Sequence, residues 1–186
     1  MFIAQQFKKQ NIVEYVLYMW QVEDIIRAYG CSLPRLRSEY IPQFDYDDEQ
    51  KEELVDWYAM LIKQMNDEGC REKGHLSTNK TLVERLEKLH QQLSNDSEKP
   101  FYKAQYYKVL PFIVELRNKR GEGHTKPHTA ETEVETCLNA LYGVMMLRLQ
   151  KKEISPDTKH AIEAISTLMG MLAEEYGSNG KANSNE

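Results

Sequence analysis

Two adjacent acids interrupt the apolar pattern between residues 12 and 29. Glu23 and Asp24 continue two apolar helical rows at places where Ile or Leu would be expected. Buried carboxylates with a nearby partner are frequent at functional sites, because burial and charge tune their proton affinity. A binding cleft would expose these acids beside aromatic residues such as Trp20. The structural alternative is that Arg27 forms a helical ion pair with Glu23, while Asp24 bonds a tyrosine hydroxyl or a loop amide.

The candidate binding residues are therefore Trp20, Glu23, Asp24 and Arg27. A cleft and a sealed core would use the same four side chains. Structural ion pairs perturb carboxylates as functional sites do, so the sequence leaves both interpretations open.

A second group of residues could bind a metal ion. Cys70 and His75 lie between two expected helices, and His124 and His128 lie between two later ones. In an up-and-down bundle these two connections would fall at the same end, where a thiolate and imidazoles suit zinc. Their spacings, Cys-x4-His and His-x3-His, are weaker than a pair of CxxC knuckles. Solvated loop histidines are the alternative interpretation.

A third candidate consists of Arg117, which is followed by Asn118, and His124, with six residues between Arg117 and His124. This pattern resembles the R-x4-6-H motif of the HEPN superfamily, whose helical domains include metal-independent ribonucleases. The resemblance implies that Arg117 would hold a scissile phosphate while His124 moves a proton to or from ribose oxygens. The alternative without catalysis is that Arg117 belongs to a basic helix C-terminus, where positive charge is favourable beside the helix dipole, and that a flexible loop follows.

The overall charge and the cysteines limit the classes of function. The 24 basic and 29 acidic residues give a net charge of -5, which argues against a nucleic-acid or anionic-membrane partner. Three widely spaced cysteines are typical of reduced intracellular thiols, and the polar N-terminus lacks the apolar region of a secretory signal. These two features predict a cytoplasmic protein. P-loop, dinucleotide and G-x-S-x-G patterns are missing, so we expect no cofactor.

The segment from Ile12 to Tyr29 is the element that must position these residues. It is apolar almost all the way round at 3.6 residues per turn, which predicts a helix wrapped by others. Its charged residues make it a poor membrane span. We therefore expect it to be the central helix of a bundle.

Five further helices follow in the expected fold. Helical spacing of apolar residues predicts them after the acidic group Asp45, Asp47 and Asp48, after Thr81, from Pro100, after Thr129 or Thr132, and from Pro156. Pro111 lies inside the fourth helix of the six and should kink or break it. Cys31 to Asp45 is expected to be a loop. Residues 177–186 are polar and are expected to be a disordered tail of a single domain, residues 1–176.

The last two helices carry more apolar surface than a terminal hairpin needs, including several methionines. This surplus favours a subunit interface or a partner groove. The helical patterns along the chain predict an all-α fold, one bundle of about six helices. We expect a non-enzymatic interaction or structural module that forms homo-oligomers or binds a protein partner. The open alternatives are the ribonuclease and a metal- or small-molecule-binding bundle.

The chain also resembles an uncharacterised family of small all-helical proteins found in Bacteroidetes. The resemblance rests on IAQQ from Ile3, YMWQVEDIIRA from Tyr18 and CLNALYGVMMLRLQKKEIS from Cys137, and it extends to about Tyr176. It implies an all-α, cytoplasmic protein. It assigns no activity, cofactor or catalytic residue.

Overall fold

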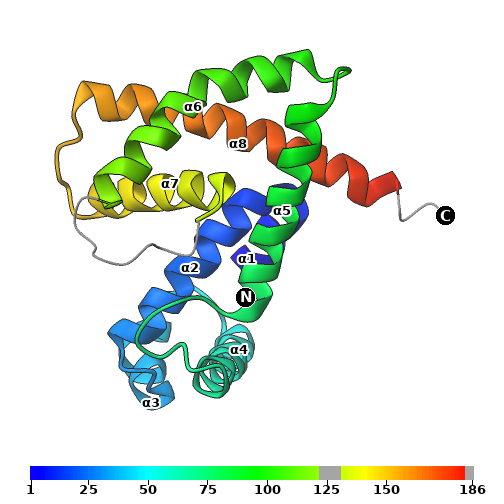
Figure 1. Ribbon diagram of the computed structural model, residues 1–186. Coiled ribbons are helices and arrows are strands. Elements are labelled where there is room, and N and C mark those ends of the chain that lie inside the picture. The colour runs from blue at the N-terminus through cyan, green and yellow to red at the C-terminus, as the bar shows by residue number, and fades with distance from the viewer. Residues whose placement is uncertain (122–130, 183–186) are drawn as a thin grey trace. The chain divides into compact units, whose positions relative to one another are not determined.

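The chain is all-helical in the computed structural model, which describes residues 1–121 and 131–182 (Figure 1). The described residues form eight α-helices and no strand, which confirms the all-α class. The helices are α1 (Phe2–Gln10), α2 (Ile12–Ala28), α3 (Leu33–Arg35), α4 (Asp48–Asp67), α5 (Ser77–Asn95), α6 (Pro100–Gly121), α7 (Glu133–Leu149) and α8 (Pro156–Ala182), with a π-helix η1 (Leu36–Tyr40) and a 3-10 helix η2 (Ile41–Gln43) between α3 and α4.

Local capping begins three helices near the predicted places, and it selects Asp47 among the three candidate acids and Thr132 over Thr129. The Asp47 carboxylate accepts the backbone N–H of Gln50 at 2.8 Å, completing a capping box at α4. Thr132 caps α7 through the N–H of Glu135, and Ser155 accepts the N–H of Thr158 at 3.2 Å at the start of α8.

The structure adds a helix that the sequence patterns did not predict, and it corrects one predicted loop. The N-terminal residues form α1, whose Ala4 is buried in the core, and the predicted loop from Cys31 to Asp45 contains α3, η1 and η2. The loop prediction was wrong because it treated Pro34 and Pro42 as helix breakers. Both prolines lie in the first turn of a short helix, where a missing N–H has no cost.

Contacts divide the chain into two compact units. Unit 1 comprises Met1–Gln10 and Glu14–Leu82, and unit 2 comprises Asn11–Val13 and Val83–Glu186. The expectation of a single domain over residues 1–176 stays a prediction.

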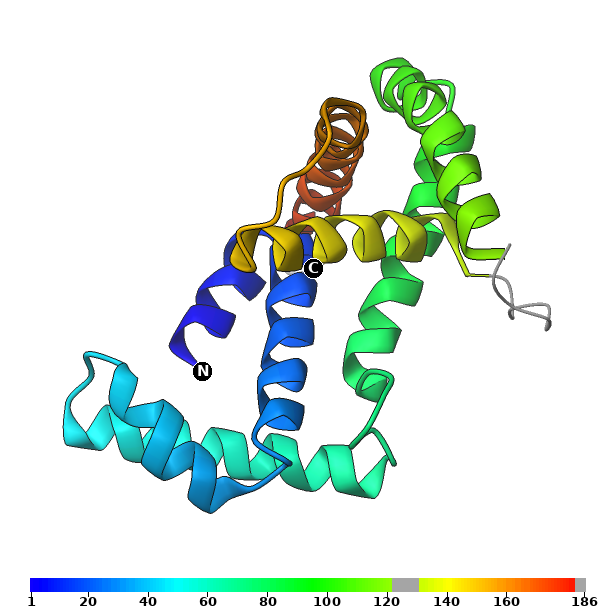
Figure 2. The ribbon, with the colours of Figure 1, turned by 90° about the vertical axis from the view of Figure 1, so that its left-hand side faces the viewer.

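In unit 1, α4 runs crosswise to α2 (Figure 2). Its core joins α1, α2, η1, η2 and α4 through buried side chains that include Met19, Ile26, Leu36, Tyr58 and Met65. From α2 the core contains Met19, Val22 and Ile26, and Glu23 of the same helix is fully buried.

Unit 2 contains α6, α7 and α8, which pack against one another (Figure 1). Its buried side chains include Val109, Ile113, Leu138, Ile165 and Leu172. The structure describes α6 as one helix through Pro111, so the helix is not broken there. α8 continues through Ala182 and includes six of the ten residues expected to form a disordered tail; residues 183–186 lie outside the described part.

Among the described residues, none of the helices combines the length and the apolar character that crossing a membrane requires.

Candidate functional site

The carboxylate of Glu23 is the centre of a buried polar cluster in unit 1. Its Oε1 accepts the backbone N–H of Leu76 at 3.0 Å and the side-chain amide of Asn79 at 2.7 Å. Its Oε2 lies 2.6 Å from Nδ1 of His75. Both oxygens are therefore occupied, as a buried carboxylate requires.

The imidazole of His75 closes this cluster on one side. It stacks on the indole of Trp20 with a centroid separation of 4.2 Å and an interplanar angle of 14°. Because an ionised carboxylate can only accept, Nδ1 of His75 acts as the donor to Glu23. The ring thus covers the acid and fixes its second oxygen.

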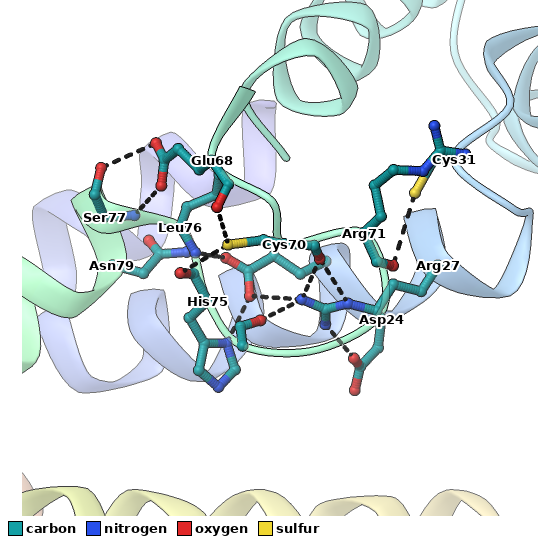
Figure 3. Close-up of polar contacts among 12 residues, drawn as sticks. Asp24, Arg27, Cys31, Glu68, Cys70, Arg71, His75, Leu76, Ser77 and Asn79 are labelled. Atoms are coloured by element: carbon teal, nitrogen blue, oxygen red, sulfur yellow. Dashed lines mark hydrogen bonds and ion pairs between the residues drawn. The ribbon is translucent and has the colours of Figure 1, made fainter. Parts of the chain in front are cut away.

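Arg27 ties the connection between α4 and α5 to α2. Its guanidinium donates to the backbone carbonyl of Cys70 at 3.1 Å and also to the carbonyl of Gly74 (Figure 3). Its Nη1 pairs with Asp24 at 2.7 Å, whereas its Nη2 stands 4.0 Å from the Glu23 carboxylate. Arg27 therefore acts mainly as a clamp on backbone carbonyls.

The start of α5 receives a second carboxylate from the end of α4. Glu68 accepts the backbone N–H of Ser77 at 2.6 Å and its hydroxyl at 2.9 Å (Figure 3). Together with the bond from Leu76 to Glu23, this places two acids at the positive end of α5. It explains why α5 begins at Ser77, earlier than the local pattern at Thr81 and Glu84 predicted.

The four candidate binding residues meet in this cluster, and the predicted pair between Arg27 and Glu23 is present, with Nη2 4.0 Å from Oε2. Arg27 pairs with Asp24 at short distance, and Glu23 bonds the residues 75–79. The side chain of Asp24 is 45% exposed, whereas that of Glu23 is fully buried. The arrangement can hold the α4–α5 connection in place; a substrate would have to displace existing bonds to reach Glu23.

The metal candidates are placed only in part. The thiol of Cys70 contacts the carbonyl oxygens of Glu68 and His75, at 3.6 Å and 3.4 Å. His124 and His128 lie outside the described residues. Within the described ranges, no group of three or more His, Cys, Asp or Glu side chains is placed to hold a metal ion.

Arg117 lies at the α6–α7 contact. Its Nε donates to the Thr136 hydroxyl at 3.1 Å, and its Nη2 donates to the Glu131 carbonyl at 2.6 Å. These bonds hold the start of α7 against α6. His124, the other residue of the predicted ribonuclease pair, lies outside the described part of the chain.

A polar pocket of about 620 Å³ opens beside Arg117 in unit 2. His90 lines it and is buried, with Nδ1 2.7 Å from the Tyr102 hydroxyl and Nε2 3.2 Å from Glu133. Burial, and then a hydrogen bond to Glu133, raises the pKa of Tyr106 to about 12. His90 thus links the buried Tyr102 to Glu133, whose side chain is 25% exposed, and His90 and Glu133 line the pocket.

Sequence reasoning missed Asn79 and His90. Asn79 follows the polar connection and carries no local signal, because its partner Glu23 is 56 residues away. His90 did have a signal: it lies four residues after Leu86 and three before Leu93, on the apolar stripe of α5. A polar residue at such a position needs a buried partner.

The fold and the Glu23 cluster together define an all-helical protein whose helix connections are fixed by buried polar groups. The sequence matches the family described as Domain of unknown function (DUF4924) over residues 1–183, and the chain belongs to this family. Neither the curated proteins nor the solved structures contain a match to it.

Proposed function

We propose that this protein is a non-enzymatic interaction module that self-associates in the cytoplasm. The observation that carries the proposal is the exposure of large apolar side chains on α6. Phe101 is 83% exposed, Tyr107 58% and Val114 49%. Exposed apolar side chains gathered on one helix favour an association surface over plain solvent contact.

The Glu23 cluster supports the same proposal. Both oxygens of Glu23 already accept or share hydrogen bonds with residues 75–79, which favours a structural role for this acid over a catalytic one. In this proposal the chain forms homo-oligomers or binds a protein partner. Its helices form a bundle of about six main elements, with a kink at Pro111. The family is proposed to be one of Bacteroidetes proteins.

Light scattering during size-exclusion chromatography tests self-association. We expect the weight-average mass to rise from that of one chain toward that of two as the protein concentration increases. A mass of one chain, 21.8 kDa, at every concentration up to the solubility limit would contradict the proposal.

A second candidate function, RNA cleavage by Arg117 and His124, is favoured by one observation: Arg117 lines the polar pocket beside His90. Incubation of the purified protein with mixed RNA, next to His124→Ala, tests it. Cleavage lost in His124→Ala would support it. No cleavage, or equal cleavage by both proteins, would exclude it.

Small-molecule or zinc binding is the remaining alternative. Thermal unfolding with a panel of amino acids and mononucleotides, repeated with Glu133→Gln, tests the polar pocket. Metal analysis of protein purified without a histidine tag tests the set Cys70, His75, His124 and His128. A zinc content far below one per chain would remove the metal site.

A further inference from the structure

The outer side of α6 carries a continuous apolar stripe. Ala104, Tyr107, Pro111 and Val114 are all exposed, and Phe101 lies at the N-terminal end of the same helix. The inner side of α6 packs on α7 and α8. Exposed apolar side chains that share one face of a helix are typical of an association surface. Within unit 2, the outer side is the part of α6 that those two helices leave exposed.

The spacing of the stripe is that of a helix-pairing seam. The steps from Ala104 to Tyr107, Pro111 and Val114 are three, four and three residues, which correspond to the a and d positions of a heptad. Such a stripe faces a second helix that crosses at a shallow angle. Its length is about 15 Å at 1.5 Å per residue, so it fits a short helix pair.

The charges beside the seam select the partner and its direction. Lys108 and Glu115 lie on the same flank, seven residues apart, and both are exposed. In an antiparallel pair of two identical helices related by a two-fold axis, equivalent flanks face each other. With the axis near residue 112, Lys108 of each chain faces Glu115 of the other. A parallel pair would instead place Lys103 beside Lys108, which repel each other.

Oε1 of Glu115 lies 2.6 Å from Nζ of Lys119, one turn later on α6, and the side chain of Glu115 is 58% exposed. An exposed helical ion pair of this kind contributes little stability, so it leaves Glu115 able to exchange partners. We propose that the outer face of α6 binds the same face of a second copy, antiparallel, with two reciprocal Lys108–Glu115 pairs. This inference rests on the proposed self-association and names its surface.

The seam spans about three turns, and such a small interface predicts a dissociation constant on the order of 1–100 µM. Sedimentation equilibrium of the full chain tests the inference with Lys108→Glu, Glu115→Lys and the double variant. Each single change places like charges opposite each other and should weaken dimerisation at least tenfold. The double variant reverses both charges and should return to within about threefold of the unaltered protein.

Val114→Glu places a charge in the seam and should leave the chain monomeric where the unaltered protein is a dimer. Lys88→Glu, at an exposed position of α5, is the matched control and should dimerise normally. Circular dichroism checks that every variant is folded. A dimer that all α6 variants leave unchanged would overturn this inference while self-association stands. A monomer at every concentration would overturn both.

Discussion

Nδ1 of His75 lies 2.6 Å from Oε2 of Glu23, and the same imidazole stacks on Trp20. This contact joins residues that are 52 positions apart in the sequence. Glu23 itself is fully buried. The polar connection between α4 and α5 is thereby attached to α2. The cluster is thus a structural device that uses hydrogen bonds where the rest of unit 1 uses apolar packing.

Glu23→Gln should destabilise the protein by about 1–3 kcal/mol. The new amide nitrogen would face a donor, because Leu76, Asn79 and His75 all donate to this side chain. The free energy of unfolding in urea measures the loss. Glu53→Gln, at an exposed position of α4, is the matched control. Equal stability of the two variants would show that the buried hydrogen bonds contribute nothing.

Arg27→Ala should free the connection between α4 and α5. The carbonyls of Cys70 and Gly74 would lose their donor, so local opening should become roughly tenfold more frequent. Trypsin cleavage after Arg71 and Lys73, followed by mass spectrometry, reports that opening.

Arg37→Ala removes only an ion pair in which both side chains are more than half exposed, and it serves as the control for Arg27→Ala. Its cleavage rate between residues 71 and 74 should match that of the unaltered protein. The clamp role of Arg27 would be refuted by equal cleavage rates in the two variants.

The contacts of Glu23 and Arg27 show which features of the structure can be predicted from local sequence patterns. Periodicity and caps predicted α2, α4, α7 and α8, because the relevant signals lie within one or two turns of each helix end. The Glu23 contacts could not be predicted, because its partners are 52 to 56 residues away. The i, i+4 rule did predict the pair between Arg27 and Glu23, which is present at 4.0 Å, although Arg27 lies closer to Asp24, at 2.7 Å.

The start of α5 was misplaced for the same physical reason. Its N-terminal amides are bonded by Glu68 and Glu23, which come from other helices, and a local pattern does not contain them. The short helices between Cys31 and Asp45 were missed because a proline can either break a helix or begin one. The sequence around such a proline does not decide which applies.

Stability should fall as the pH rises from about 10 to 12. Burial, as the largest cause, raises the pKa of Tyr18 and of Tyr106 to about 12 in the folded protein. In the unfolded chain these phenols ionise near pH 10. Their contribution is therefore complete below pH 10 and is lost as the pH rises through 12.

Urea unfolding across this pH range measures the loss. The double variant Tyr18→Phe/Tyr106→Phe should show a shallower decline, because two of the shifted groups are gone. An unfolding free energy that stays constant between pH 10 and 12 in the unaltered protein would contradict the shifted pKa values.

Cys31 should be the fast-reacting thiol of the three. Burial is the largest cause that raises the pKa of Cys137, to about 12, so at about pH 8 only roughly one molecule in ten thousand carries its thiolate. Cys70 is buried, whereas Cys31 is partly exposed. Titration with a chromogenic disulfide should show one fast phase that Cys31→Ser abolishes. A fast phase that survives in Cys31→Ser and disappears in Cys137→Ser would refute this prediction.

The most direct test of pairing through α6 is to mix the two charge variants, Lys108→Glu and Glu115→Lys. Each alone should sediment as a monomer at a concentration where the unaltered protein is a dimer. In the mixture, glutamates at positions 108 and 115 of one chain face lysines at positions 115 and 108 of the other. We therefore expect the mixed sample to regain the mass of two chains. A mixture that remains as monomeric as its components would contradict antiparallel pairing of α6.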